Sequence, residues 1–109
     1  MPFDEGLAQR IRETLEHRGG ISEKKMFGGL CFMLNGNMVA GVVAHELMVR
    51  VGKDAYEDAL SQRHAREMDF TGKVMRGMVF VAEKGFQEDE DLNRWIDRGL
   101  SFAKTLPKK

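Results

Sequence analysis

The chain has 109 residues, of which 42% are hydrophobic and 31% are charged, a composition typical of one soluble domain with its own core. Basic and acidic residues each number 17, so the formal net charge is zero, and direct nucleic-acid binding is not the expected main task. The polar, acidic N-terminus lacks a signal-peptide core and no window holds the ~18 apolar residues of a membrane span, so we expect one cytoplasmic domain over residues 1–109.

A helix from Phe3 to His17 is the first expected element. Its apolar residues recur every four positions, which places them in one stripe along a helix, formed by Leu7, Ile11 and Leu15. Asp4 is suited to cap the N-terminus, and Gly19-Gly20 ends the helix because glycine tolerates a left-handed backbone.

The next part of the chain has the pattern of an antiparallel sheet. The apolar run at residues 26–34 predicts a strand, and Asn35-Gly36 predicts a tight hairpin because both residue types accept a positive φ. The runs at 38–44 and 47–51 then predict two further strands of a meander.

The second half of the chain predicts two helices around another hairpin. A short helix is expected near residues 54–60, followed by a strand near 67–70 and a longer one over 74–82. From the acidic run at 88–91 onward, apolar residues at helical spacing predict a final helix, in which Gly99 is expected to mark close packing of the backbone.

These elements predict an α+β fold of two layers. We expect the order α-β-β-β-α-β-β-α, with helices packed on one face of an antiparallel five-stranded sheet.

No residue pattern points to catalysis, to a cofactor or to a metal ion. Cys31 is the only cysteine, which excludes an internal disulfide, and its apolar strand favours a small buried hydrophobe over a nucleophile. His17, His45 and His64 lie far apart in the sequence and lack the spacing of metal ligands. We therefore expect a protein that is not an enzyme and that binds no cofactor.

Gly28-Gly29 resembles part of a glycine-rich phosphate-binding loop, but the residue spacing of a P-loop is absent. Glycines within a strand more often indicate a bulge or the close approach of another backbone, and this is the interpretation we favour.

The eight methionines are many for this length. Strict alternation places Met33, Met48 and Met75 on the sheet face that the helices leave bare, where adaptable side chains suit a homodimer or a partner surface. Ordinary packing is the alternative interpretation of these methionines.

Arg50 and Arg76 each interrupt an apolar strand, with Glu67 and Asp69 on a strand nearby. Cross-strand ion pairs are the favoured interpretation, and a binding face is the alternative. The complete candidate interaction or ligand face consists of Met26, Phe27, Gly28, Gly29, Met48, Arg50, Asp69, Met75 and Arg76.

Several longer motifs occur in a fixed order along the chain. They are Lys25-Met26-Phe27-Gly28-Gly29, residues 34–38, residues 47–52, residues 66–72, Met75-Arg76-Gly77, and a closing group of Leu92, Trp95, Gly99, residues 100–103 and Leu106-Pro107. With these motifs, the sequence resembles the N-terminal domain of the TfoX/Sxy family over almost its whole length. The resemblance implies the fold given above and supplies no catalytic residues.

The named members of that family are regulators of competence development, thought to act at promoters together with the cyclic-AMP receptor protein. They carry a second, C-terminal domain, whereas this chain is expected to be a stand-alone bacterial member that ends at Lys109. The resemblance implies a non-enzymatic regulatory or protein-interaction module, with the transcription machinery as a partner by family analogy only. The alternative is a small-ligand-binding or enzymatic domain with a site near Arg50, Asp69 and Arg76.

Overall fold

The computed structural model describes residues 3–26, 28–70 and 72–108. Within these residues, six strands form one antiparallel sheet in the order β1-β2-β3-β4-β6-β5. The elements in chain order are α1 (Glu5–Leu15), β1 (Ile21–Met26), β2 (Gly29–Leu34), β3 (Asn37–Val43), β4 (Glu46–Arg50), α2 (Tyr56–Leu60), β5 (Ala65–Phe70), β6 (Lys73–Val81), the short 3-10 helix η1 (Glu83–Gly85) and α3 (Asp89–Ala103).

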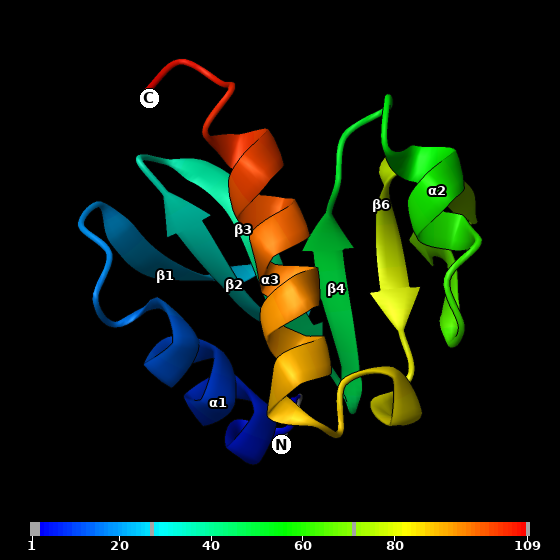
Figure 1. Ribbon diagram of the computed structural model, residues 1–109, viewed down its shortest axis with the longest axis horizontal. Coiled ribbons are helices and arrows are strands. Elements are labelled where there is room, and N and C mark those ends of the chain that lie inside the picture. Colours follow the sequence, from blue (N-terminus) through cyan, green and yellow to red (C-terminus); the bar gives the residue numbers. More distant parts are fainter. Residues whose placement is uncertain (1–2, 27, 71, 109) are drawn as a thin grey trace.

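The helices lie on one face of the sheet, as the sequence predicted. Helix α3 packs over β3 and β4, α1 lies beside it against β3, and α2 packs against the β5–β6 end (Figure 1). Their apolar faces close one core with the sheet, which includes Leu7, Ile11, Phe32, Val42, Leu47, Tyr56, Val79, Leu92, Ile96 and Leu100. The predicted two-layer α+β fold is therefore confirmed.

The predicted number of strands, five, was wrong, because residues 21–26, most of which precede the apolar run at 26–34, form an additional strand. Gly28 has a φ of 76°, and the chain reverses there, so that β1 pairs antiparallel with β2 and Met26 faces Gly29. Strand β1 lies at the edge of the sheet, and its four central residues are exposed. The residues of β1 show no apolar alternation, so no periodic signal predicted this strand.

Three local predictions are confirmed in the structure. The Asp4 carboxylate accepts hydrogen bonds from the backbone N–H groups of Gly6 and Leu7, at 2.9 and 3.2 Å, and so caps α1. Asn35 and Gly36 turn the chain between β2 and β3 with φ values of 51° and 85°. Gly99 brings α3 so close to β3 that an added Cβ would lie 2.4 Å from the carbonyl oxygen of Val39.

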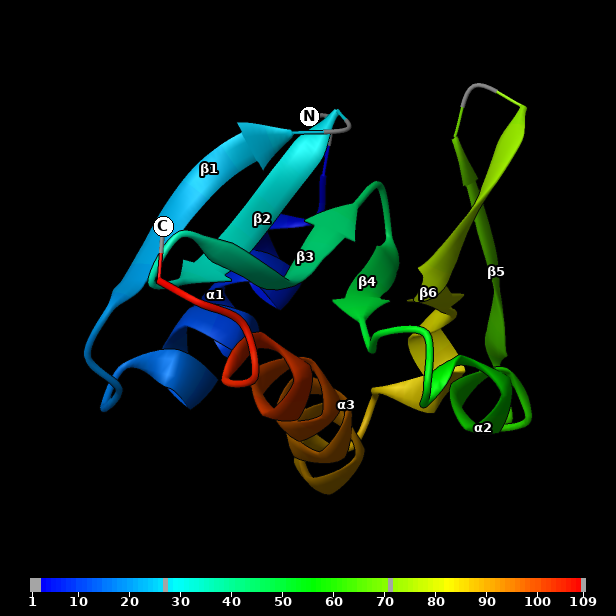
Figure 2. The same cartoon turned by 90° about the horizontal axis from the view of Figure 1, so that it is seen from above.

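The other face of the sheet carries a second, methionine-rich core. Figure 2 shows a strongly twisted sheet, with the β1–β2 and β5–β6 hairpins at its two ends and the helices all on one side. The buried residues of this second core are Cys31, Met38, Met48, Met68, Met78 and Phe80. Cys31, Gly41, Met48 and Phe80 occupy successive strands in register, and the missing side chain of Gly41 leaves room for the Met48 methyl group.

Candidate functional site

The predicted interaction face does not form one exposed surface. Met48 points away from the helices, as the alternation predicted, but it is fully buried in the second core, and Met26 packs partly buried against that core. The expectation that Met48 lies on an open face was therefore wrong, because the twisted sheet fills that side with its own side chains. Phe27 and the side chain of Met75 lie outside the described residues.

Among the residues that the structure describes, Arg50 forms none of the predicted cross-strand ion pairs. Its guanidinium lies over the ring of Phe102 on α3, 5.2 Å from the ring centroid. The ion pair across the strands is instead Arg66 with Glu46, and Arg66 also stacks on Phe80 at 4.8 Å. Cation–π contacts of this kind hold both arginines against the protein.

Asp69 and Arg76 are both exposed, on β5 and β6, and the described residues show no ion pair between them. The register agrees with this, because Asp69 faces Val74 and not Arg76. Arg76 lies instead near Tyr56, whose buried hydroxyl has no hydrogen-bond partner among the described residues. Burial raises the pKa of that phenol, and Arg76 opposes the shift.

Gly28 and Gly29 lie at the β1–β2 turn and do not form a bulge within one strand. The expected close backbone approach is present, since a Cβ on Gly29 would lie 2.0 Å from the carbonyl oxygen of Val42. A side chain larger than hydrogen does not fit there, so Gly29 is explained by packing.

Cys31 is fully buried, and burial raises the pKa of its thiol to about 11. A thiol with that pKa is protonated at neutral pH and is a poor nucleophile. Within residues 3–26, 28–70 and 72–108, no three His, Cys, Asp or Glu side chains gather as a metal site would need. No helix in those ranges is long and apolar enough to cross a membrane.

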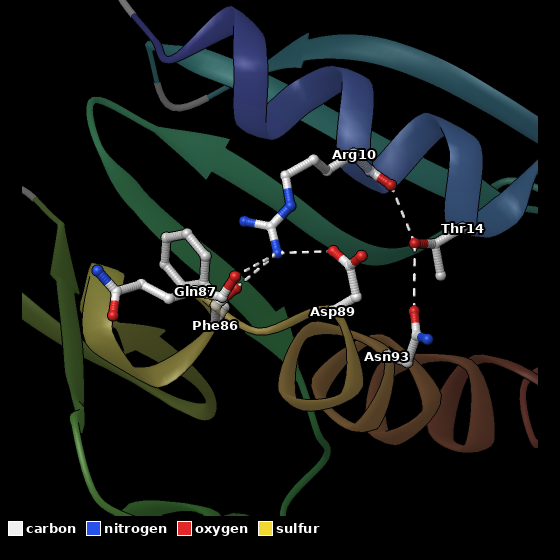
Figure 3. Close-up of polar contacts among 6 residues, drawn as sticks. All are labelled: Arg10, Thr14, Phe86, Gln87, Asp89 and Asn93. Carbon is white, nitrogen blue, oxygen red and sulfur yellow. Dashed lines mark hydrogen bonds and ion pairs between the residues drawn. The ribbon is translucent and has the colours of Figure 1, made fainter.

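A polar cluster fixes the start of α3 against α1 (Figure 3). The Arg10 guanidinium donates to the carbonyl oxygens of Phe86 and Gln87 at 2.8 and 3.0 Å, and to the Asp89 carboxylate at 3.1 Å. Beside it, Thr14 donates to the carbonyl oxygen of Arg10 and contacts Asn93. Because all of these hydrogen bonds are made within the chain, we interpret the cluster as a structural contact that holds α1 and α3 together.

A groove lies between α3 and the loop that follows β4, and we call it the α3 groove. Its volume is about 820 Å³. It is lined by Val51, Gly52, Lys53, Asp54 and Ala55 from the loop and by Arg94, Asp97, Arg98, Ser101, Phe102 and Thr105 from the last part of the chain. Its apolar lining residues are buried or partly buried and form its floor, whereas Lys53, Asp54, Arg94 and Asp97 are exposed and form its rim.

Gly52 determines how the floor of the α3 groove is built. Its φ is +82°, and an added Cβ would lie 2.4 Å from the ring of Phe102. The Phe102 ring therefore packs closely on the Gly52 backbone, and the Arg50 guanidinium lies over the same ring. The N–H groups of Val51 and Gly52 both donate to the carbonyl oxygen of Gly77, at 2.8 and 3.0 Å, which anchors the loop.

A second hollow, which we call the cationic pocket, lies on the other side of Arg94 and Arg98 and has a volume of about 450 Å³. It is lined by Gln62, Arg63 and His64 after α2, by Lys84 and Gly85 in η1, and by Asp91, Arg94, Trp95 and Arg98 in α3. Arg94 pairs with Asp91, while Arg98 pairs with Asp58 at 3.0 Å and lies 5.3 Å from the Trp95 ring centroid.

Sequence reasoning missed both hollows, because their walls come from segments that are far apart in the chain. One local signal was present, since Arg94 and Arg98 are four residues apart on one helix face. Like charges at that spacing slightly destabilise an isolated helix, and here Asp91 and Asp58 each pair with one of the two arginines.

A family model for the TfoX N-terminal domain matches residues 13–103, which include all of the strands and α3. No curated protein matches the sequence.

Proposed function

This chain belongs to the TfoX N-terminal domain family, and we propose that it is a non-enzymatic interaction module that binds a partner protein in the α3 groove. The regulatory role implied by the resemblance to competence regulators is part of this proposal. The shape and the lining of the groove are the observation that carries it.

The α3 groove has the anatomy of a protein interface. Phe102, Val51 and Ala55 offer an apolar floor, and polar or charged residues surround it, including Lys53 and Asp97. An apolar centre with a polar rim is the arrangement found at specific protein–protein contacts. A volume of about 820 Å³ is large enough to take one or two apolar anchor side chains of a partner.

The groove is also fixed before any partner arrives. Gly52 and Arg50 both contact the Phe102 ring, and the carbonyl oxygen of Gly77 anchors the loop by accepting two backbone hydrogen bonds. Because few groups have to be ordered on binding, little affinity is lost to conformational entropy.

The charges on the rim indicate the kind of partner. Lys53, Arg94 and Arg98 are basic, whereas Asp54 and Asp97 are acidic. A mixed rim of this kind complements a protein segment that carries both charges beside its apolar anchors, and it repels part of any uniformly charged polymer. We therefore propose a protein segment, and not a nucleic acid, as the occupant.

The proposed absence of catalysis is supported by the state of the reactive groups. The Cys31 thiol is buried and protonated, and His17, His45 and His64 are exposed and belong to different parts of the fold. None of Arg50, Asp69 and Arg76 lines the α3 groove or the cationic pocket, so these two hollows do not favour the alternative ligand site near those residues.

A peptide-display selection tests the proposal. A library of 12-residue peptides is selected on the wild-type domain. The affinity of the selected peptides is then measured for two variants, Ala55→Arg, which fills the groove, and Lys24→Glu, which alters the exposed edge strand β1. We expect binders with apolar anchors and both charges that lose at least about tenfold in affinity with Ala55→Arg and keep it with Lys24→Glu.

Binders that tolerate Ala55→Arg, or a selection that yields none, would contradict the proposal. Light scattering of the wild-type domain over a concentration series is the accompanying control for self-association. A dimer that Ala55→Arg converts to a folded monomer would identify a second copy of the chain as the occupant and would overturn the choice of a different protein.

A further inference from the structure

We propose that the cationic pocket binds a phosphate dianion, either free or carried by a small phosphorylated molecule. The site is separate from the α3 groove, although Arg94 and Arg98 form the wall between the two. The proposal rests on the charge of the pocket, on its rigid frame and on two cations without carboxylate partners.

The charge of the pocket is out of balance in a chain whose net charge is zero. Arg63, Lys84, Arg94 and Arg98 bring four positive charges to its lining. Two of them form ion pairs with carboxylates, Arg94 with Asp91, which belongs to the lining, and Arg98 with Asp58, which lies outside it. Two positive charges remain, which is the number that a phosphate monoester dianion neutralises.

The two cations that remain without a partner are Arg63 and Lys84. Neither makes an ion pair within the described residues, and both are exposed at the mouth of the pocket. They come from two segments that are far apart in the sequence, the connection after α2 and the 3-10 helix η1, and both line the same pocket. Arginine offers a planar fork and lysine a mobile point charge, and both are common ligands of phosphate oxygens.

The backbone that carries these cations is held firmly. A Cβ on Gly85 would lie 3.0 Å from the Cβ of His64 and 2.6 Å from a methyl carbon of Val81, so η1 packs directly on the α2–β5 connection. The Ala82 N–H donates to the carbonyl oxygen of His64 at 2.9 Å, and His64 itself has a φ of 70°. A fixed frame lets the cations bind an anion without first ordering the chain.

The pocket is large enough to hold a small phosphorylated molecule as well as a free phosphate ion. About 450 Å³ exceeds the space of one phosphate group and lies within the range of small-molecule sites. Trp95 forms part of the wall, and Arg98 is stacked on it. The arginine–tryptophan stack gives the rest of a small molecule a flat surface beside the phosphate.

Trp95 is the single tryptophan of the chain, so its fluorescence reports directly on this pocket. The test titrates the wild-type domain with inorganic phosphate and with glucose 6-phosphate, and sodium chloride of matched ionic strength is the control. We expect a saturable change with at least one phosphate probe and none with chloride. Isothermal calorimetry on the same samples covers the case of a ligand that leaves the indole undisturbed.

The decisive variant is Arg63→Gln with Lys84→Gln. The matched control, Lys24→Gln with Lys25→Gln, removes the same charge from the exposed edge strand β1. We expect the first pair to weaken phosphate binding by about tenfold or more and the control to change it by less than about twofold. Because all four side chains are exposed, unchanged thermal midpoints should show that both variants remain folded.

The two probes distinguish the two sources of the phosphate group. Equal affinity for both indicates a site for free phosphate, and tighter binding of the ester indicates a phosphorylated small molecule. No saturable signal by either method, equal weakening by both double variants, or the same response to chloride would each overturn the proposal. None of these results affects the α3 groove, because Arg63 and Lys84 do not line it.

Discussion

Gly99→Ala is the substitution that tests the packing of α3 on the sheet most directly. The new Cβ would lie 2.4 Å from the carbonyl oxygen of Val39 and 2.9 Å from its Cγ1 atom. Carbon and carbonyl oxygen normally come no closer than ~3.3 Å, so the helix must move away from β3 by roughly 1 Å. That movement loosens the buried contacts of Trp95, Ile96 and Leu100 on either side of the site.

Two effects of opposite sign determine the change in the free energy of unfolding. Overpacking of a filled core costs about 1–3 kcal/mol, while replacing glycine by alanine in a helix interior returns about 1 kcal/mol. The contact is with backbone and cannot be relieved by a side-chain rotation, so the upper part of the overpacking range applies. We expect the free energy of unfolding to fall by about 1–2 kcal/mol. Each kcal/mol lowers the Tm of a domain of this size by roughly 4–8 °C.

Urea unfolding followed by the fluorescence of Trp95 measures this loss. Ser101→Ala is the matched control, because Ser101 is an exposed position of the same helix and gains helix propensity without entering the core. We expect a midpoint below wild type for Gly99→Ala and one at or slightly above it for the control, with the same slope m. A Gly99→Ala variant as stable as wild type at unchanged m would refute the close packing of α3 on β3.

Three further predictions concern other parts of the fold. Asp4→Ala removes the side-chain cap of α1 and should cost about 1 kcal/mol in urea unfolding, with Asp4→Asn as the control that retains a capping oxygen. Cys31 should resist iodoacetamide at pH 8 in the folded state and react on addition of urea, since burial raises its thiol pKa to about 11; rapid labelling of the native protein would contradict this. The hydrogen bond with Arg12 lowers the pKa of Glu23, so its contribution to stability is present above the pKa of a free glutamate, about 4.3, and is lost as the pH falls further. The stability difference between wild type and Glu23→Gln should therefore shrink between pH 6 and pH 3, and a difference that grows on acidification would show that the sign is wrong.

The sequence alone was sufficient for elements whose signals are local. Helix α1 carries its own apolar stripe and its Asp4 cap, and the hairpin at Asn35-Gly36 needs only two residues that accept a positive φ. The close packing at Gly99 was also readable, because glycine weakens a helix interior and suits it best where no side chain fits. In each case the cause lies within a few residues of the effect.

Strand β1 and the pairing of Arg50 required the tertiary structure. The exposed residues of β1 become a strand because β2 offers them a partner, and nothing in their own pattern indicates it. Arg50 was expected to pair across the sheet, but it stacks on Phe102, which is more than fifty positions away in the chain. Contacts between distant segments depend on how whole helices and strands pack together, so they produce no periodic pattern in the sequence.

The same reason accounts for the methionines and the two hollows. Alternation placed Met48 correctly away from the helices, yet whether that face is open depends on the twist summed over six strands, which buries it. The α3 groove and the cationic pocket likewise exist only where α3 meets the loop after β4 and the connection after α2. The sequence by itself thus determined the helices, five of the six strands and the side of the sheet on which Met48 lies, because these depend on short-range sterics and periodicity. Only the tertiary structure decided which surfaces remain open to a partner, because that depends on how curvature and packing bring distant segments together.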